Sequence, residues 1–350
     1  MCWTPPTRFP AAFALPDVIV IGAGICGASA AHFLAERGRE VLVLDRAGVS
    51  EGTTGRGEGN VLVADKLPGY ERDMTVLGRQ LWNELGDAFA QARVTRKGAL
   101  LLDHPDGRTA ADLEPALAPG VRCLREPGDL QVDAAGLARA LLAGMEVRVG
   151  VDVVGVEAGA VRTAGGERLT AGRVVVATGP WAHELTGLPV EPRKGQLVAL
   201  AAPPGLIRHK LIEAAYIRTA TSGEPGRMLA AVIEQTLDGD EVLVGSSRER
   251  VGFDARVDGE LTRAMLARAA RFVPALAELP VRREWCGFRP WMPDGLPAVG
   301  ALAGGVWTTC GHEGSGVALG PISGLLLAQL MVGESPACDP APIDPRRFPV

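Results

Sequence analysis

Residues 17–45 alternate apolar runs with small residues in an order that predicts a strand, a tight turn, a helix and a second strand. The runs at residues 17–21 and 40–44 are rich in Val, Ile and Leu, as in buried parallel strands. Gly22, Gly24 and Gly27 lie between them, at the predicted start of the helix. The pattern therefore predicts a βαβ unit near the amino terminus.

The spacing of these glycines is typical of a dinucleotide-binding turn. Gly22 permits the tight turn, Gly24 lets the backbone approach a pyrophosphate, and Gly27 lets the helix pack closely on the strand. The helix amino terminus then offers N–H groups and a positive dipole end to phosphates. Asp45 ends the second strand, where a carboxylate can accept hydrogen bonds from both ribose hydroxyls and disfavours a 2′-phosphate.

Further along, the periodicity changes from mixed helices and strands to a run of strands. We expect an antiparallel sheet in residues 196–254, followed by a helix over 259–273. The uncharged stretch 314–333 predicts a buried helix from Pro321 to Val332 rather than a membrane span. Other expected helices are 67–91 and 134–143, and other expected strands are 97–103, 146–149, 151–157, 160–163 and 173–179.

Composition narrows the class of protein. The chain has 350 residues, a net charge of −5 and no block of like charge, so nothing favours a nucleic-acid partner. Its six cysteines form no Cys-x-x-Cys pair, which argues against a metal site or a disulfide framework and favours a reducing, cytoplasmic setting. Residues 1–16, rich in proline, are expected to be a loose extension.

Candidate ligand-binding segments recur at the start, middle and end of the chain. They are the glycine-rich loop 50–59, the small residues 177–179 after a predicted strand, and the glycine-rich turn 311–316. A nicotinamide dehydrogenase usually has one continuous cofactor block, whereas a permanently held flavin is enclosed between two domains. The distribution therefore favours a flavin.

These segments, with residues 287–290 (Gly-Phe-Arg-Pro) and 294–297 (Asp-Gly-Leu-Pro), resemble one known family over residues 17–333. The chain is similar to the D-amino-acid oxidase-like FAD-dependent oxidoreductases. It looks like the branch of glycine oxidase, sarcosine oxidase and the flavin subunits of hydrogen cyanide synthase, opine dehydrogenase and D-hydroxyproline dehydrogenase.

The resemblance implies an α/β fold (α+β overall) with a Rossmann-like FAD-binding domain and an inserted substrate domain built on an antiparallel sheet. The FAD-binding domain would comprise residues 1–66, 127–190 and 285–350. The substrate-binding domain would comprise residues 67–126 and 191–284.

The resemblance also implies noncovalent FAD. The turn 314–316 would place N–H groups near flavin N1 and the C2 carbonyl, and Cys310 and His312 lie in the same loop. Residues that match cofactor-binding positions are Gly22, Gly24, Ile25, Gly27, Asp45, Arg46, Thr53, Thr54, Gly57, Glu58, Gly59, Val153, Thr178, Gly179, His312, Gly314, Ser315 and Gly316.

Arg289 matches the residue that binds the substrate carboxylate in amino-acid-oxidising relatives. A guanidinium suits this role because its planar fork makes two parallel charge-assisted hydrogen bonds. The alternative for Arg289 is a structural salt bridge. Tyr216, His209 and Asn60 are further site candidates. Glu58 and Glu234 are also candidates, for which solvated carboxylates are the simpler alternative.

The resulting hypothesis is FAD-dependent oxidation of a small amino acid or secondary amine at its C–N bond. A hydride would pass to flavin N5, and the imine product would hydrolyse. Oxygen or an iron–sulfur partner subunit would take the electrons. The alternatives are an NAD-linked dehydrogenase and a flavin-holding scaffold subunit of a multisubunit dehydrogenase.

Overall fold

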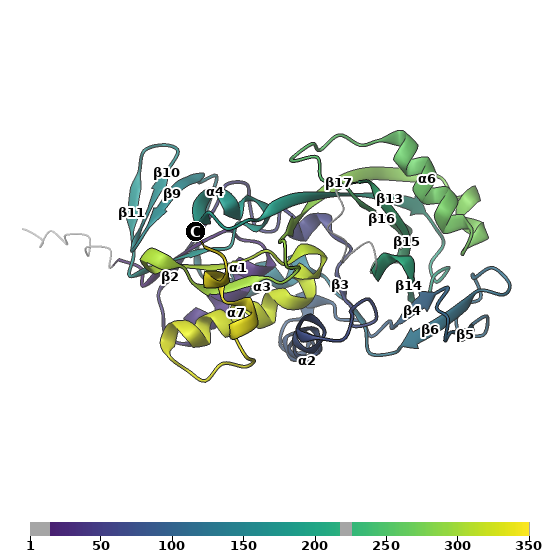
Figure 1. Cartoon of the computed structure of the whole chain (residues 1–350), viewed down its shortest axis with the longest axis horizontal. Coiled ribbons are helices and arrows are strands. Elements are labelled where there is room, and N and C mark those ends of the chain that lie inside the picture. Colours follow the sequence, from purple (N-terminus) through teal and green to yellow (C-terminus); the bar gives the residue numbers. More distant parts are fainter. Residues whose placement is uncertain (1–14, 218–225, 350) are drawn as a thin grey trace, which may run out of the picture.

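The computed structural model describes residues 15–217 and 226–349. Two large sheets dominate an elongated molecule, one toward each end (Figure 1). Most of the predicted loose extension, residues 1–14, lies outside the described residues.

The first sheet has six strands and contains the predicted βαβ unit. All neighbouring strands in it are parallel except β18 and β19, which are antiparallel. Every residue of β1 is buried, as its unbroken Val-Ile-Val-Ile run predicts. In spatial order the strands are β18 (Ala298–Ala301), β19 (Val306–Cys310), β12 (Arg173–Val176), β1 (Val18–Ile21), β2 (Val41–Asp45) and β8 (Glu146–Val149).

Helices cover this sheet and share its core. Helix α1 (Ile25–Glu36) follows the glycine turn, and Asp133 caps α3 (Ala134–Leu141) by accepting from the Gly136 N–H, as predicted. Helix α7 (Gly316–Val332) packs along α1. Glycine permits the close approach, because a Cβ at Gly324 would lie 2.6 Å from Ala30 N.

The apolar stretch near the carboxy terminus is a core helix, although its predicted start was wrong. Helix α7 begins at Gly316, so Pro321 lies inside it rather than at its first position. Pro321 has no N–H to donate to the Val317 carbonyl. The indole Nε1 of Trp82 donates to that carbonyl instead, at 2.8 Å, which explains why the proline is tolerated. Most of α7 is buried although its length and hydropathy would suffice for a membrane span.

The second sheet has eight strands and is antiparallel except where β14 pairs with β4. Helix α6 (Gly259–Ala270), capped by Asp258, packs Leu261, Met265 and Ala269 on one face of it (Figure 1). In spatial order the strands are β17 (Val281–Trp291), β13 (Glu191–Ala201), β16 (Glu241–Arg248), β15 (Met228–Gln235), β14 (Lys210–Glu213), β4 (Ala99–Leu102), β6 (Arg122–Glu126) and β5 (Arg108–Thr109).

The described residues also contain two further helices and two small sheets. The predicted helix 67–91 is observed as α2 (Tyr70–Ala88), and α4 (Ala182–Thr186) follows β12. The small sheets are β11 (Arg168–Thr170), β10 (Ala160–Thr163) and β9 (Val153–Glu157), and the pair β3 (Asn60–Val61) and β7 (Leu130–Gln131).

The proposed domain division stays a prediction. The strands of the eight-stranded sheet fall within residues 99–126 and 191–291, close to the predicted substrate-binding segments. Helix α2, however, packs on α7, and its Trp82 and Leu85 join the same core as α1. This packing favours placing residues 70–88 with the nucleotide-binding part.

Candidate active site

One cavity of about 450 Å³ extends between the two large sheets. It is lined by residues from the glycine turn, from 52–60, from 177–181 and from 309–318. Strand β17 and the turn around Asp45 complete its wall. The structure thus brings together the three chain segments that the sequence singles out.

The glycine turn forms one end of this cavity with a backbone that no larger residue could adopt. Gly22 has φ +108°, and a Cβ on it would lie 2.4 Å from the Ala177 carbonyl oxygen. A Cβ on Gly27 would lie 1.9 Å from the Gly22 carbonyl oxygen. Gly24, the N-cap residue of α1, has no side chain to cap the helix, and Gly24 and Ile25 line the cavity. A helix start that faces a cavity in this way suits a phosphate group.

Asp45 is fixed at the predicted ribose position. One carboxylate oxygen accepts from Ala23 N at 2.8 Å, and the other accepts from the N–H groups of Ala47 and Gly48. Arg46 packs over the Trp181 ring, with 3.9 Å from guanidinium carbon to ring centroid. All of these except Ala23 line the cavity, as does Val153, so the cavity contains both residues predicted to contact the adenosine, Asp45 and Val153.

The hydroxyl groups of two threonines bear on whether the cavity suits a polar cofactor. Thr54 Oγ1 accepts from Ile25 N at 3.1 Å, so the glycine-rich loop is joined to the start of α1. Thr178 lines the cavity, and its buried hydroxyl has no hydrogen-bond partner among the described residues. Buried hydroxyls are rarely left unpaired, so this one indicates a missing polar ligand. The residues present therefore fit the phosphates and ribityl chain of FAD.

The loop before α7 supplies the predicted flavin-side residues. Gly314, Ser315 and Gly316 line the cavity at the helix start, and Ser315 Oγ donates to the Glu71 carboxylate on α2. His312 is buried, with Nε2 3.0 Å from Ser323 Oγ. Burial lowers the pKa of His312 to about 4, so its imidazole is neutral at pH 7.

Cysteine side chains also border this loop. Cys310 lines the cavity, and burial raises the pKa of its thiol to about 11. Cys26, which the sequence analysis did not select, lines it too, with Sγ 3.7 Å from His312 Nδ1. A buried thiol with a raised pKa is a poor nucleophile. The prediction of noncovalent FAD is consistent with this, and direct contact of Cys310 or His312 with the ring stays a prediction.

Arg289 lines the cavity from β17 and makes no ion pair among the residues described. Its Nη1 donates to the Ser247 carbonyl and its Nη2 to Ser246 Oγ, both at 3.0 Å. Gly195 leaves room for the guanidinium, since a Cβ there would lie 2.2 Å from Nη1. The alternative of a structural salt bridge therefore finds no carboxylate within ion-pair distance of Arg289 in the described part of the chain.

Buried charges surround Arg289. Glu313 lines the cavity, and its Oε1 lies 3.3 Å from Arg248 Nε and 3.5 Å from Arg193 Nη1. Burial alone would raise the pKa of Glu313, but Arg248, Arg289 and Arg193 together lower it, so the group is ionised. Tyr216 lines the same region beneath the Arg248 guanidinium, 4.3 Å from its ring centroid. The sequence analysis found Arg289 and Tyr216 but missed Glu313.

His209 does not belong to this site. It is absent from the cavity lining, and its Nδ1 lies 3.2 Å from the Glu114 carboxylate, which also accepts from the Arg208 and His209 N–H groups. The interpretation of Glu234 as a solvated carboxylate was wrong, because Glu234 is completely buried. Glu58 does line the cavity, as does Asn60, and both also contact the buried interior of the second sheet.

The sequence analysis also missed a lysine at the cavity. Lys66 Nζ lies 2.6 Å from Asp65 and 3.9 Å from Glu71, and both Lys66 and Asp65 line the cavity. Burial disfavours its charge, but Asp65 and Glu71 raise the pKa of Lys66. The position of this Asp-Lys pair soon after the glycine-rich loop was the available signal.

The family model described as FAD dependent oxidoreductase, DAO, matches residues 17–330. The chain belongs to this family. It is therefore an FAD-dependent oxidoreductase, as the resemblance implied, and the nicotinamide alternative is wrong. The residue-level contacts with FAD remain predictions.

Individual similar proteins support the assignment to this family. Glycine oxidase of Pseudomonas aeruginosa is 29% identical, covering 94% of this chain and 98% of the relative. Hydrogen cyanide synthase subunit HcnC of the same species is 32% identical over 59% of this chain and 48% of its own length. The crystal structure of glycine oxidase from Geobacillus kaustophilus, 26% identical, superposes with a TM-score of 0.83 over 96% of this chain and 99% of that one.

Proposed function

We propose that the protein oxidises a small amino acid or secondary amine at its C–N bond. The C–H bond beside nitrogen breaks, its hydrogen leaves as hydride, and the nitrogen lone pair forms the C=N bond. The proton on nitrogen is released, and water then hydrolyses the imine to a carbonyl compound and ammonia, or an amine when the substrate is a secondary amine. Bound FAD would supply the hydride acceptor at N5.

The observation that carries this proposal is Arg289. Its guanidinium lines the cavity with only neutral oxygens as hydrogen-bond partners among the described residues. A substrate carboxylate can therefore bind there without displacing an ion pair, through two charge-assisted hydrogen bonds. The similarity to proteins named glycine oxidase supports an amino-acid substrate.

The surrounding residues define how a substrate would be oriented. Tyr216 and Leu197 line the cavity on the side of the second sheet, and ionised Glu313 lies close to Arg289. With its carboxylate on Arg289, a small amino acid would present its amine and C–H bond to the cofactor-binding side. Holding the reacting atoms at about 3–3.5 Å is the main contribution such a site makes to the rate.

Anaerobic mixing of the FAD-loaded enzyme with glycine, sarcosine, proline derivatives and D-amino acids tests the proposal. At least one of these compounds should bleach the flavin absorbance within one turnover. A carbonyl reagent should then trap the carbonyl product. Retention of the oxidised spectrum with every compound would contradict the proposal and favour a flavin-holding scaffold subunit.

We also propose that an iron–sulfur partner subunit, rather than oxygen, reoxidises the reduced enzyme. The support is the resemblance to flavin subunits and the similarity to HcnC, a protein named as a subunit. Reduced enzyme should react slowly with air-saturated buffer and rapidly with an artificial one-electron acceptor. Fast reoxidation by oxygen alone would overturn this part.

A further inference from the structure

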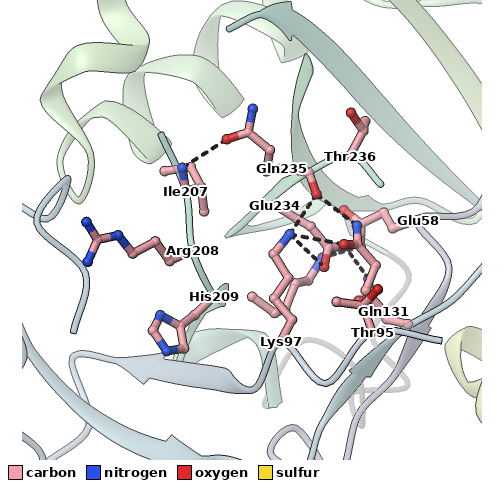
Figure 2. Close-up of polar contacts among 12 residues, drawn as sticks. Glu58, Thr95, Lys97, Gln131, Ile207, Arg208, His209, Glu234, Gln235 and Thr236 are labelled. Atoms are coloured by element: carbon pink, nitrogen blue, oxygen red, sulfur yellow. Dashed lines mark hydrogen bonds and ion pairs between the residues drawn. The ribbon is translucent and has the colours of Figure 1, made fainter. Parts of the chain in front are cut away.

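A largely buried network of opposite charges includes Lys210 and Glu234, and Figure 2 shows its members Glu58, Lys97 and Glu234 close together. Lys210 Nζ lies 2.8 Å from Glu58 Oε2 and 3.3 Å from Glu234 Oε2. Glu234 also accepts from Asn60 Nδ2 at 2.8 Å, and its other oxygen lies 3.7 Å from Lys97 Nζ. Lys210 is 1% exposed and Glu234 is completely buried.

The members of the network come from two different parts of the fold. Glu58 belongs to the glycine-rich loop, Asn60 begins β3 directly after it, and both line the cavity. Lys210 on β14 and Glu234 on β15 belong to the second sheet, and neither lines the cavity. The network therefore joins the end of the glycine-rich loop to the second large sheet.

The loop is fixed on its opposite side by backbone contacts. The Gly59 carbonyl accepts from Val132 N at 2.8 Å, and Gly59 has φ +75°. A Cβ on Gly59 would lie 2.2 Å from the Val132 carbonyl oxygen. The backbone at Gly59 thus packs closely against Val132, and the neighbouring side chains of Glu58 and Asn60 contact the second sheet. Because both sides are held, the loop has little freedom to move.

The groups in the network do not all favour the ionised form equally. Burial disfavours the charge of Lys210, but Glu234 and Glu58 raise its pKa, so Lys210 is a cation. Burial raises the pKa of Glu234 and lowers that of Lys97, so this pair is the weaker one. The ion pair of Lys210 with Glu58 is therefore the main electrostatic link between loop and sheet.

Stability alone does not account for such a network, because apolar side chains of similar volume often stabilise a core as well as buried ions do. Ion pairs have the advantage of fixing one arrangement. We propose that Lys210 and Glu234 are positioning residues, which hold Glu58 and Asn60, and with them the loop 57–60, in the shape that binds FAD. The pair of Glu58 with Lys210 would then couple FAD affinity to the second sheet.

FAD titration of apoprotein, followed by quenching of flavin fluorescence, tests this proposal in Lys210→Met, Glu58→Gln and the double variant. We expect FAD affinity to fall at least tenfold in Lys210→Met, although Lys210 lies outside the cavity lining. We expect the double variant to bind FAD no more weakly than the worse single variant, because both changes remove the same link. Full additivity would contradict the coupling.

Arg268→Met is the matched control. Arg268 on α6 pairs with Glu213, on the same strand as Lys210, at 2.6 Å, and neither residue lines the cavity. The control should lower the melting temperature while leaving FAD affinity within twofold of wild type. If Lys210→Met and Glu58→Gln also stay within twofold, or if Arg268→Met weakens FAD as much as they do, the network is only structural.

Lys210→Gln provides a second route if Lys210→Met does not fold, since its amide, although one bond closer to the backbone, keeps two N–H donors directed toward the carboxylates. It should melt near wild type and still bind FAD more weakly, and unchanged affinity would overturn the proposal. These titrations use FAD without substrate. Their failure would therefore leave the proposed amine oxidation untouched, and failure of the substrate panel would leave the positioning role untouched.

Discussion

The two regions of the cavity differ in the chemical groups that form their walls. At the nucleotide end, backbone and small residues do the shaping, since Gly22 and Gly27 leave no space for a Cβ. At the proposed substrate end, the long charged side chains of Arg289 and Glu313 line the cavity beside Tyr216 and Leu197. A backbone-built region follows from a short stretch of sequence, whereas a charge-built region exists only after distant strands have come together.

The difference also separates their energetics. A helix start and tight glycine packing bind phosphates with groups that folding has already oriented. Buried charges cost desolvation and stabilise the fold only when each finds its partner. Substitutions at the nucleotide end should therefore change FAD binding, and those at Arg289 should change the reaction while FAD stays bound.

The largest effect is expected from Arg289→Ala. Loss of a desolvated charge partner typically costs about 2–5 kcal/mol, so the rate constant for flavin reduction per unit substrate should fall roughly a hundredfold or more. Stopped-flow absorbance measures this, and the FAD content of the purified variant should equal that of wild type. Arg289→Lys should recover only part of the rate, because it lacks the planar fork. Equal rates in all three would remove Arg289 from the site.

His312 gives a pH-dependent effect of intermediate size. Its pKa is about 4 in the folded protein and near 6.5 in the unfolded chain, so only the unfolded chain gains a proton between these values. Stability should therefore be lost as the pH falls from 6.5 to 4, by roughly 3 kcal/mol from this residue. Urea unfolding at several pH values should show a smaller loss in His312→Gln.

His183→Gln is the control for that measurement, since His183 is exposed. It should keep the pH dependence of the wild type. A His312→Gln variant with the same acid sensitivity as wild type would contradict the assignment of this loss to His312.

Gly27→Ala probes the backbone-built end directly. A methyl group 1.9 Å from the Gly22 carbonyl oxygen forces the turn and α1 apart, at a cost of about 1–3 kcal/mol. FAD affinity should fall roughly tenfold or more in a fluorescence titration. Gly259→Ala, where a Cβ meets open space, should bind FAD like wild type. Similar affinities in the two variants would show that the turn does not shape the FAD site.

The smallest effect is expected at Arg46. Arg46→Met removes the contact with the Trp181 ring, and exposed cation–π contacts are worth about 0.5–1 kcal/mol. FAD binding measured by titration should weaken about two- to fivefold, with no change in the rate of flavin reduction at saturating FAD. An altered reduction rate would mean that Arg46 acts beyond the nucleotide end.

The nucleotide end could be predicted from sequence because its signals are local. The signals lie within residues 17–45 and comprise the glycine turn, the second strand and Asp45 at the end of that strand. The expected strands and helix were found there. Pro321 misled the prediction for the last helix, since nothing local reveals that Trp82 would satisfy the carbonyl that the proline leaves free. That information exists only in the tertiary structure.

The charge-built end was only partly predictable. His209 was selected although Lys210, one residue on, carries the buried contacts, and successive side chains of an extended chain point to opposite faces. Lys210 is the first residue of β14 and Glu234 follows the apolar run of β15, and a charged residue next to apolar strand positions is the one signal that was available. Which cation meets which carboxylate depends on strand order, because Glu58 and Lys210 are far apart in the chain.

A crystal structure of the FAD-loaded enzyme with a small carboxylic acid such as acetate tests the central claim most directly. The account predicts FAD along the cavity, its pyrophosphate at the start of α1, and the acid carboxylate within hydrogen-bonding distance of Arg289 beside the flavin ring. A carboxylate bound elsewhere in the cavity, with Arg289 still bonded only to Ser246 and Ser247, would contradict it.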